Sequence, residues 1–294
     1  MAIRQDSRWF SIVNGIYLSA FVISVIYPLW YLMMLSLSTF GGLNEKHRVF
    51  LFTPAGFTLD AYINFFKQRF IHTGYAVTMF RTIVGTISSV FLMAFTGYAL
   101  SKKTLPGRKL FTTYFVFTMF FNGGLIPTYL LIRDLGLLNN IWVLVLIPLF
   151  NAYYILILRS YFSGIPNEIL EAAKIDGSGE LRTFFQIVTP LSVPALITIA
   201  TWMGFNHWNA WFDSLIYIHD INKQVVQLHI RRIVIEQSQL LLAGVMQIGV
   251  KAEMPTEESI RAAGIMITVI PVLIVFPFAK RFFQKGATLG AVKG

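Results

Sequence analysis

Six long apolar stretches constrain this chain more than any other feature of its sequence. A helix needs about 20 mostly apolar residues to cross the hydrocarbon of a bilayer. Stretches of roughly this length occur at residues 12–37, 77–100, 110–132, 141–162, 191–218 and 260–283. Only 13% of the 294 residues are charged, about half the share in an ordinary soluble domain. We therefore predict an all-α integral membrane protein with six transmembrane helices, forming a single domain over residues 1–294.

Several functional classes are disfavoured by what the sequence lacks. The first apolar stretch is too long for a signal-peptide core, so we expect it to remain as a helix. Cysteine is absent, which excludes disulfides, thiolate metal sites and cysteine nucleophiles. The five histidines, at positions 47, 72, 207, 219 and 229, have no ligand spacing. We therefore expect no metal and no cofactor in this chain. We also expect no nucleic-acid partner, because a net charge of +10 is explained by Lys and Arg that flank membrane helices.

Proline interrupts four of the stretches, at Pro28, Pro127, Pro148 and the pair Pro271 and Pro277. Each proline frees backbone groups that only neighbouring protein or water can satisfy in a membrane. The third stretch also contains residues 122–124, Asn-Gly-Gly, just before its proline. This combination predicts a local break, which serves either helix packing or contact with a substrate.

The basic residues of the short loops predict the orientation of the chain. The loop between the second and third stretches contains Lys102, Lys103, Arg108 and Lys109 and no acid. Such loops lie on the cytoplasmic side. With six crossings, both termini are then cytoplasmic, the connections 38–76 and 219–259 lie outside, and the connection 163–190 lies in the cytoplasm.

The cytoplasmic connection contains the polar segment EAAKIDGSGELRTFFQIVTP, residues 171–190. Pro166 in the first turn, Glu168 near the positive end of the helix dipole and Gly177 as a stop predict a short amphipathic helix. A second helical piece is expected over residues 180–188. Residues at spacings of three and four would share one small-residue face open to a partner: Ile169, Ala172, Ala173 and Asp176.

This segment resembles the EAA loop of binding-protein-dependent ABC importers. Glu171, Ala172 and Ala173, followed by Gly177, Ile187 and Pro190, match the pattern of that loop, with Thr189 where Leu is usual. Residues 57–66, 123–148 and 285–294 are similar to maltose-permease-like carbohydrate permeases that import oligosaccharides released from polysaccharides. Within that subgroup the chain is similar to the shorter of two related permease subunits.

The resemblance implies a transport subunit, not an enzyme, in the bacterial cytoplasmic membrane. Its implied partners are a homologous second permease, two cytosolic ATPases that carry the ATP and Mg, an extracytoplasmic solute-binding protein and an oligosaccharide. The EAA loop would insert into a cleft of the ATPase, with Glu171 facing a basic residue and Gly177 allowing the turn. The implied coupling residues are Glu171, Ala172, Ala173, Asp176, Gly177, Ile187 and Pro190. The tail 290–294 would either dock between the ATPases or fray.

No ATP site is visible in this chain. The P-loop pattern is absent, and residues 176–180, DGSGE, lack its length and its lysine. An ATPase must therefore be a separate polypeptide.

The fifth stretch is unusually rich in aromatic and amide side chains. Aromatic faces stack on sugar rings and planar amides bond hydroxyls, so we interpret five residues as a candidate substrate pathway: Trp202, Asn206, Trp208, Asn209 and Trp211. An interfacial aromatic belt is the alternative, but it explains the amides and Asp213 poorly. His207 would either bind an acidic sugar or only pack.

The outer connection contains residues 225–241, which we expect to form a helix or a strand near the membrane surface. Its Arg231 and Arg232, together with Lys223, would attract an acidic oligosaccharide such as an oligouronate. With Arg261 included, five acids balance five basic residues in this connection, which weakens the argument.

Three other functions were weighed against the permease. A secondary carrier would show inverted repeats or ionisable coupling residues in mid-membrane, and neither is evident in the sequence. A membrane enzyme would need clustered histidines and carboxylates or a Ser/Lys pair. An ABC permease for a solute other than a sugar remains an alternative.

Overall fold

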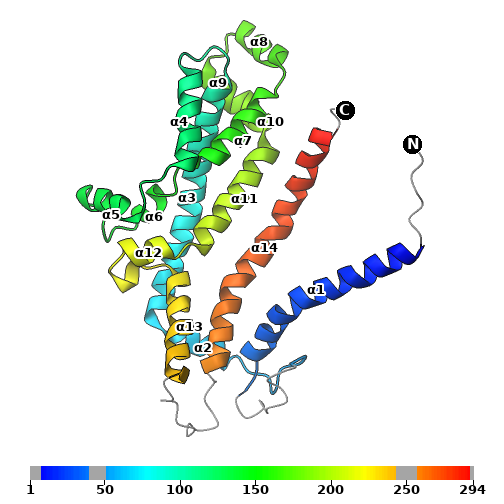
Figure 1. The fold of residues 1–294 in the computed structure, drawn as a ribbon, viewed down its shortest axis with the longest axis vertical. Coiled ribbons are helices and arrows are strands. Elements are labelled where there is room, and N and C mark those ends of the chain that lie inside the picture. Colours follow the sequence, from blue (N-terminus) through cyan, green and yellow to red (C-terminus); the bar gives the residue numbers. More distant parts are fainter. Residues whose placement is uncertain (1–7, 40–50, 243–256, 292–294) are drawn as a thin grey trace. The chain divides into compact units, whose positions relative to one another are not determined.

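The computed structural model describes residues 8–39, 51–242 and 257–291, and nearly all of their regular structure is helical (Figure 1). Within these ranges the only β-type pairing is an isolated bridge between Ser38 and Phe57. Three helices are long and apolar enough to cross a membrane: α1 (Arg8–Ser36), α3 (Arg69–Ser101) and α14 (Glu257–Ala291). The predicted all-α class is confirmed. Pro28 lies inside α1, and Pro271 and Pro277 lie inside α14, so these prolines do not end their helices.

Two further candidate spans are bent pairs of shorter helices. In the first pair, α4 (Arg108–Phe120) meets α5 (Leu125–Asp134) at 115°. Gly124 between them has φ +87°, and its amide donates to the Asn122 side chain at 2.8 Å. The break that the sequence predicts at this point is confirmed.

In the second bent pair, the segment Glu180–Leu191 meets α11 (Val193–Asn209) at 83°. That segment consists of α9 (Glu180–Thr183), a π-helix (Phe184–Val188) and α10 (Thr189–Leu191). The predicted stretch 191–218 is therefore not one helix, because α11 ends at Asn209 and α12 (Phe212–Tyr217) follows. The described residues thus provide three to five candidate spans, compared with the six expected.

The stretch 141–162 is also divided. It contains α6 (Val143–Leu146) and α7 (Ala152–Ser163), with Pro148 in the break. Asn151 caps α7 by accepting hydrogen bonds from the amides of Tyr153 at 3.0 Å and Tyr154 at 3.4 Å. A 12-residue helix covers about 18 Å at 1.5 Å per residue, too little to cross the hydrocarbon alone.

Shorter helices complete the described structure. They are α2 (Asp60–Lys67), α8 (Asn167–Ile175), a 3-10 turn (Ile221–Lys223) and α13 (Val226–Leu242). Helix α13 answers the open choice between helix and strand for residues 225–241. The part of the outer connection between residues 243 and 256, and residues 292–294 of the tail, lie outside the described residues.

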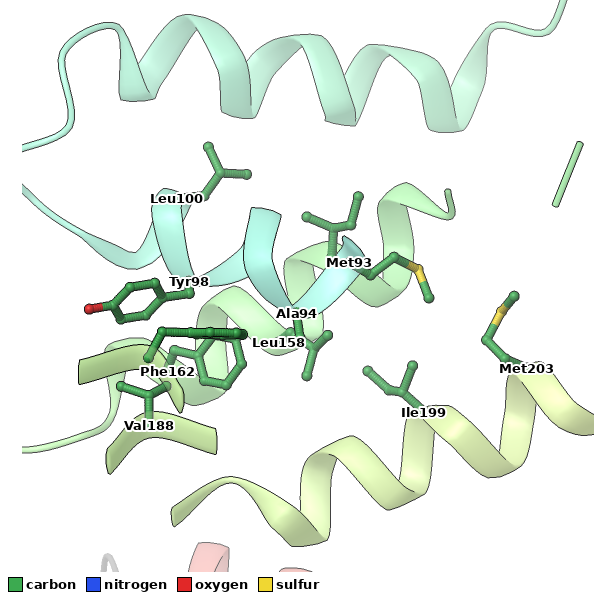
Figure 2. Packing of buried hydrophobic residues seen from close by; sticks show 11 residues of the cluster. Met93, Ala94, Tyr98, Leu100, Leu158, Phe162, Val188, Ile199 and Met203 are labelled. Atoms are coloured by element: carbon green, nitrogen blue, oxygen red, sulfur yellow. The ribbon is translucent and has the colours of Figure 1, made fainter. Parts of the chain in front are cut away.

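The chain packs as two compact units, residues 1–69 with 230–270 and residues 70–229 with 271–294. In the first unit, Met34, Leu35 and Leu51 form a small core with Ala262. In the second, α3, α7 and α11 surround a larger core, shown in Figure 2. A second cluster of that unit gathers residues from α5, α6, α12 and α13.

One face of α3 consists mostly of small or polar residues and is buried within the second unit. Small residues let helix backbones approach closely in a membrane. At Gly97, an added Cβ would lie 3.0 Å from the Leu158 Cβ and 3.2 Å from the Arg159 amide of α7. The buried face recurs every three or four residues: Gly74, Thr78, Arg81, Gly85, Ser89, Met93 and Gly97. Helix α3 is therefore closely packed by its neighbours in the second unit, and the candidate sites described next all contact it or lie on helices that do.

Candidate functional site: a two-helix segment, an aromatic hollow and a buried ion pair

The first candidate site is the two-helix segment, residues 166–190, which lies near the end of α3 at which α4 begins (Figure 1). Helix α8 starts directly after Pro166, carries Glu168 in its first turn and Lys174 in its last. Gly177 follows with φ +75°, a left-handed conformation that glycine adopts most readily. The Ser178 amide then donates to the Ala173 carbonyl at 2.9 Å, which closes the end of the helix. The predicted helix, stop and second helical piece are all present.

Three of the four residues of the expected open face of α8 are exposed: Ile169, Ala172 and Asp176. Glu171 and Ile175, which lie beside that face, are exposed too, Ile175 to 87%. Ala173 is only 5% exposed, so the expectation that this residue is open is wrong. Its contact with a partner stays a prediction.

The end of the two-helix segment is a change of helix type followed by a bend. Ile187 is half-buried in the π-helix, and Pro190 is exposed in the first turn of α10. Single-turn π-helices are rare and occur frequently at functional sites. The segment therefore joins α11 through a defined bend and not through a straight helix.

Three side chains tie the second half of this segment to α3. The Glu180 carboxylate accepts a hydrogen bond from the Tyr98 hydroxyl at 2.6 Å and pairs with the Lys102 ammonium at 3.0 Å. The same ammonium lies 4.5 Å from the centre of the Tyr98 ring. Nearby, the hydroxyls of Ser178 and Thr183 are 3.1 Å apart. Residues from two elements about 80 positions apart are thus held together at one end of α3.

The second candidate site is an open hollow of about 340 Å³ beside α11. Trp202 stacks on Tyr154 with ring centres 5.7 Å apart and an interplanar angle of 29°. The Asn206 amide donates to the Tyr154 hydroxyl at 3.4 Å. The lining residues are Tyr153, Tyr154, Trp202, Phe205 and Asn206. Flat aromatic faces next to amide and hydroxyl groups suit a ligand that has both apolar ring faces and hydroxyls.

The other three predicted pathway residues lie elsewhere. Trp208 is 5% exposed and packs edge-on against Tyr75, with ring centres 6.0 Å apart. Asn209 is exposed but donates its amide to the Phe205 carbonyl at 2.9 Å. Trp211 is half-buried against the cluster around α12 and α13. The structure therefore brings together only Trp202 and Asn206 of the five, and adds two tyrosines that our sequence interpretation missed.

His207 lies on the opposite, buried face of α11 and is 1% exposed. A Cβ added to Gly85 would lie 2.5 Å from a carbon of its imidazole ring. The ring therefore occupies the space that a side chain at position 85 would need. This arrangement fits the packing interpretation of His207 and leaves it away from the hollow.

A buried ion pair joins α3 to the break between α11 and α12. Both terminal nitrogens of Arg81 bind the Asp213 carboxylate, at 3.0 and 2.6 Å, and they also donate to the carbonyls of Ala210 and Leu144, each at 3.3 Å. Arg81 is 1% exposed. A charge inside a membrane protein usually faces the interior and is paired, as here. Arg81 is the only charged residue of the stretch 77–100, and that isolation is the sequence signal that could have identified it.

Few groups in this site suit a metal or a cofactor. Over the described ranges, no three His, Asp or Glu side chains gather as a metal site would require. The Lys223 ammonium lies 3.3 Å from the Asn139 carbonyl. That lysine is therefore already engaged within the chain.

These features, a helical membrane chain with a polar two-helix segment on a bend, are those of a transporter's permease subunit. The chain is 38% identical, over 290 residues, to the polygalacturonan/rhamnogalacturonan transport system permease protein YtcP of Bacillus subtilis strain 168, and the match covers 99% of this chain and 100% of that protein. It therefore belongs to the carbohydrate permeases of ABC transport systems. No family model matches the sequence.

Two solved structures extend the comparison to the fold. A chain of a bacterial ABC transporter involved in the import of the acidic polysaccharide alginate has a TM-score of 0.84 and 30% identity, covering 96% of this chain and 99% of that one. A chain of a bacterial alginate ABC transporter, in complex with an alginate pentasaccharide-bound periplasmic protein, has a TM-score of 0.55 and 14% identity, covering 95% and 98%. The second likeness concerns the fold alone.

Proposed function

We propose that this chain, a permease subunit of an ABC importer for oligosaccharides, uses its two-helix segment to receive the motion of cytosolic ATPases. ATP and Mg would be bound by those separate subunits. The observation that carries the proposal is the exposure of α8. Exposed charged side chains surround Ile175, which is 87% exposed, and an apolar side chain within a polar rim suits a contact with another protein.

The proposed partners follow from the membership of the family. A homologous second permease would complete the pathway, two ATPases would dock on the two-helix segments, and an extracytoplasmic solute-binding protein would deliver the sugar. Glu171 would face a basic residue of the ATPase, while Ala172, Asp176 and Gly177 would lie in its cleft. Ala173, Ile187 and Pro190 would act within this chain by holding the segment in shape.

The proposed topology keeps six crossings in one domain, with both termini in the cytoplasm of a bacterial cell. Helices α1, α3 and α14, the bent pair of α4 and α5, and α11 would supply five crossings, and residues 141–163 would supply the sixth as a broken span. The basic residues Lys102, Lys103, Arg108 and Lys109 stand near the two-helix segment at one end of α3, which supports a cytoplasmic location for that end.

We further propose that the aromatic hollow is a sugar contact and that the sugar is acidic. Stacking on Trp202 and hydrogen bonding to Asn206 would hold the ring of the sugar. The lining carries no formal charge, so the carboxylates of an oligouronate would be recognised elsewhere in the assembled importer. Support for acidity comes from two relatives, one named for polygalacturonan and one for alginate.

Reconstituted transport tests the coupling role. We expect Glu171→Arg in the complete importer to lower ATP-driven uptake by at least about tenfold, equivalent to about 1.4 kcal/mol of lost interaction. Glu168→Arg, which reverses another exposed acid of the same helix three positions earlier, is the matched control and should keep most of the uptake. Unaltered uptake in Glu171→Arg protein that inserts normally would contradict the coupling role.

A second measurement tests the hollow and the sugar together. Uptake of trigalacturonate, a mannuronate trisaccharide and maltotriose should favour one of the two acidic sugars. Trp202→Ala should raise the KM for that sugar about three- to tenfold, because an aromatic contact contributes about 0.5–1.5 kcal/mol. Trp142→Ala removes a similarly exposed tryptophan outside the hollow (47% compared with 38%) and serves as the control. Equal effects of the two variants would argue against the hollow, and preference for maltotriose would argue against acidity.

A further inference from the structure

The two halves of the two-helix segment differ in how firmly the chain holds them. Helix α8 exposes most of its residues, whereas α9 and the π-helix begin on a set of contacts with the last turn of α3. Glu180 is the first residue of α9, Tyr98 lies in the last turn of α3, and Lys102 is the residue after that helix. A force applied to α8 therefore reaches α3 through the contacts of Glu180 and its neighbours.

The geometry of these contacts is that of a joint with both a polar and an apolar part. Tyr98 is 6% exposed, and Figure 2 shows its ring against the core with the hydroxyl directed outward. The ring packs on Phe162 and on Phe184 of the π-helix, at 6.4 and 5.3 Å between centres. Phe184 also meets Phe95 edge-on at 5.5 Å. The hydroxyl and Lys102 then hold the Glu180 carboxylate from the side of α3.

We propose that Tyr98, Lys102 and Glu180 are positioning residues that make α3 follow the two-helix segment when the ATPases move it. This inference rests on the proposed function. Without this joint, a displacement of α8 would pass mainly along the chain through the bend at residue 192 into α11. With it, α3 and α11 move together, so the buried face of α3 keeps its contacts while the transport pathway opens.

These contacts add little to the stability of the fold, so a positioning role can be distinguished from a role in folding. The Glu180 side chain is 58% exposed, and ion pairs at such sites add little to stability. Loss of the Tyr98 hydroxyl removes one hydrogen bond and leaves the ring in its apolar contacts. Variants at these positions should therefore fold and insert, and any defect they show in transport is a defect in coupling.

The test uses the complete importer in proteoliposomes, with its binding protein and whichever of the three trisaccharides the wild-type complex imports fastest. Tyr98→Phe and Glu180→Gln should each lower uptake about fivefold while ATP hydrolysis stays within about twofold of wild type, so more ATP is used per sugar imported. The double variant should be no worse than the more defective single variant, because both changes act on the same small set of contacts around the Glu180 side chain. Tyr161→Phe is the control, since this tyrosine packs on the same core and its hydroxyl has no hydrogen-bond partner among the described residues.

Each outcome bears on the proposal. Unchanged ATP use per sugar in Tyr98→Phe, a parallel fall in uptake and hydrolysis, or additive defects in the double variant would overturn it. A lowered melting temperature in Tyr98→Phe but not in Tyr161→Phe would show a structural role instead and would also overturn it. If Glu171→Arg abolishes uptake while Tyr98→Phe does not change it, the joint is wrong and the coupling segment stands. If Glu171→Arg has no effect either, the proposed function itself fails.

Discussion

Helix α3 carries one ion pair within its length and a second directly after its last residue, and the two pairs differ in burial and in geometry. Within the helix, Arg81 binds Asp213 through two nitrogens and also binds two backbone carbonyls, with side-chain exposures of 1% and 17%. Directly after the helix, Lys102 meets Glu180 through a single contact at 3.0 Å, with exposures of 18% and 58%. The first pair is a fixed cross-link, because breaking it would leave a charge in a dry interior. The second is adjustable, because water replaces either partner at little cost.

This difference divides α3 into a fixed part and an adjustable part. The part around Arg81 is fixed, because it is cross-linked to the break between α11 and α12 and to α12 and lies next to the close contact at Gly85. The part next to Lys102 is adjustable and contacts the two-helix segment, which would receive force. Motion is expected where the contacts are weak and exposed, since local stability is lowest there.

Of all changes at the two ion pairs, Asp213→Ala should cause the largest loss of stability. It leaves the Arg81 guanidinium buried without its counter-ion, and such a loss costs about 3–5 kcal/mol of unfolding free energy. Thermal or SDS-induced unfolding of the purified protein would measure it. Asp134→Ala is the matched control, because its pair with Arg133 is nearly as short, at 2.9 Å compared with 2.6 Å, but is 54% and 64% exposed. This variant should cost under about 1 kcal/mol.

A second variant protects this prediction from a trivial loss of folding. Arg81→Met combined with Asp213→Leu removes both charges, and it should recover most of the stability that Asp213→Ala loses. If Asp213→Ala lowered the stability no more than Asp134→Ala does, the part of α3 around Arg81 would not be fixed, and the contrast between the two ion pairs would disappear.

The features that the sequence predicts well are those set by local chemistry. The break near Pro127 follows from two glycines placed shortly before a proline. The end of α8 follows from Gly177. In both cases a few neighbouring residues decide the backbone conformation. The all-helical class follows from the length of the apolar stretches. Hydropathy reports the solvent around a segment, however, and not its continuity. The stretches 141–162 and 191–218 are therefore each apolar enough on average to be predicted as one span and yet are divided into shorter helices.

The features that the sequence does not predict depend on contacts between distant residues. Arg81 and Asp213 are 132 positions apart, and nothing local to either one names its partner. Ala173 satisfies the pattern of its loop, but its burial depends on how α8 lies against the rest of the chain. The two tyrosines of the hollow belong to α7, and only the packing of α7 beside α11 brings Tyr154 to Trp202.

Substitution of Gly85 tests the fixed part of α3 with a smaller expected loss of stability. Its Cα faces the buried ring of His207, and an added methyl would lie 2.5, 2.6 and 2.9 Å from three ring atoms. Because the ring is 1% exposed and enclosed, it cannot easily move aside, and overpacking of this kind costs about 1–3 kcal/mol. Gly85→Ala should therefore lower the unfolding temperature, although alanine is the better helix former.

Gly204→Ala is the matched control for this change, because Gly204 lies in α11, the helix that carries His207, and an added methyl there would meet its nearest neighbour, the Thr86 hydroxyl, at 3.6 Å. That distance is ordinary van der Waals contact, so this variant should be neutral or slightly stabilising. His207→Ala introduced into the Gly85→Ala protein should be less costly than the two single changes added together, since the ring and the new methyl compete for one space. Equal stability of Gly85→Ala and Gly204→Ala would mean that the part of α3 around Arg81 yields as readily as the part next to Lys102, and the division of α3 into a fixed and an adjustable part would have to be abandoned.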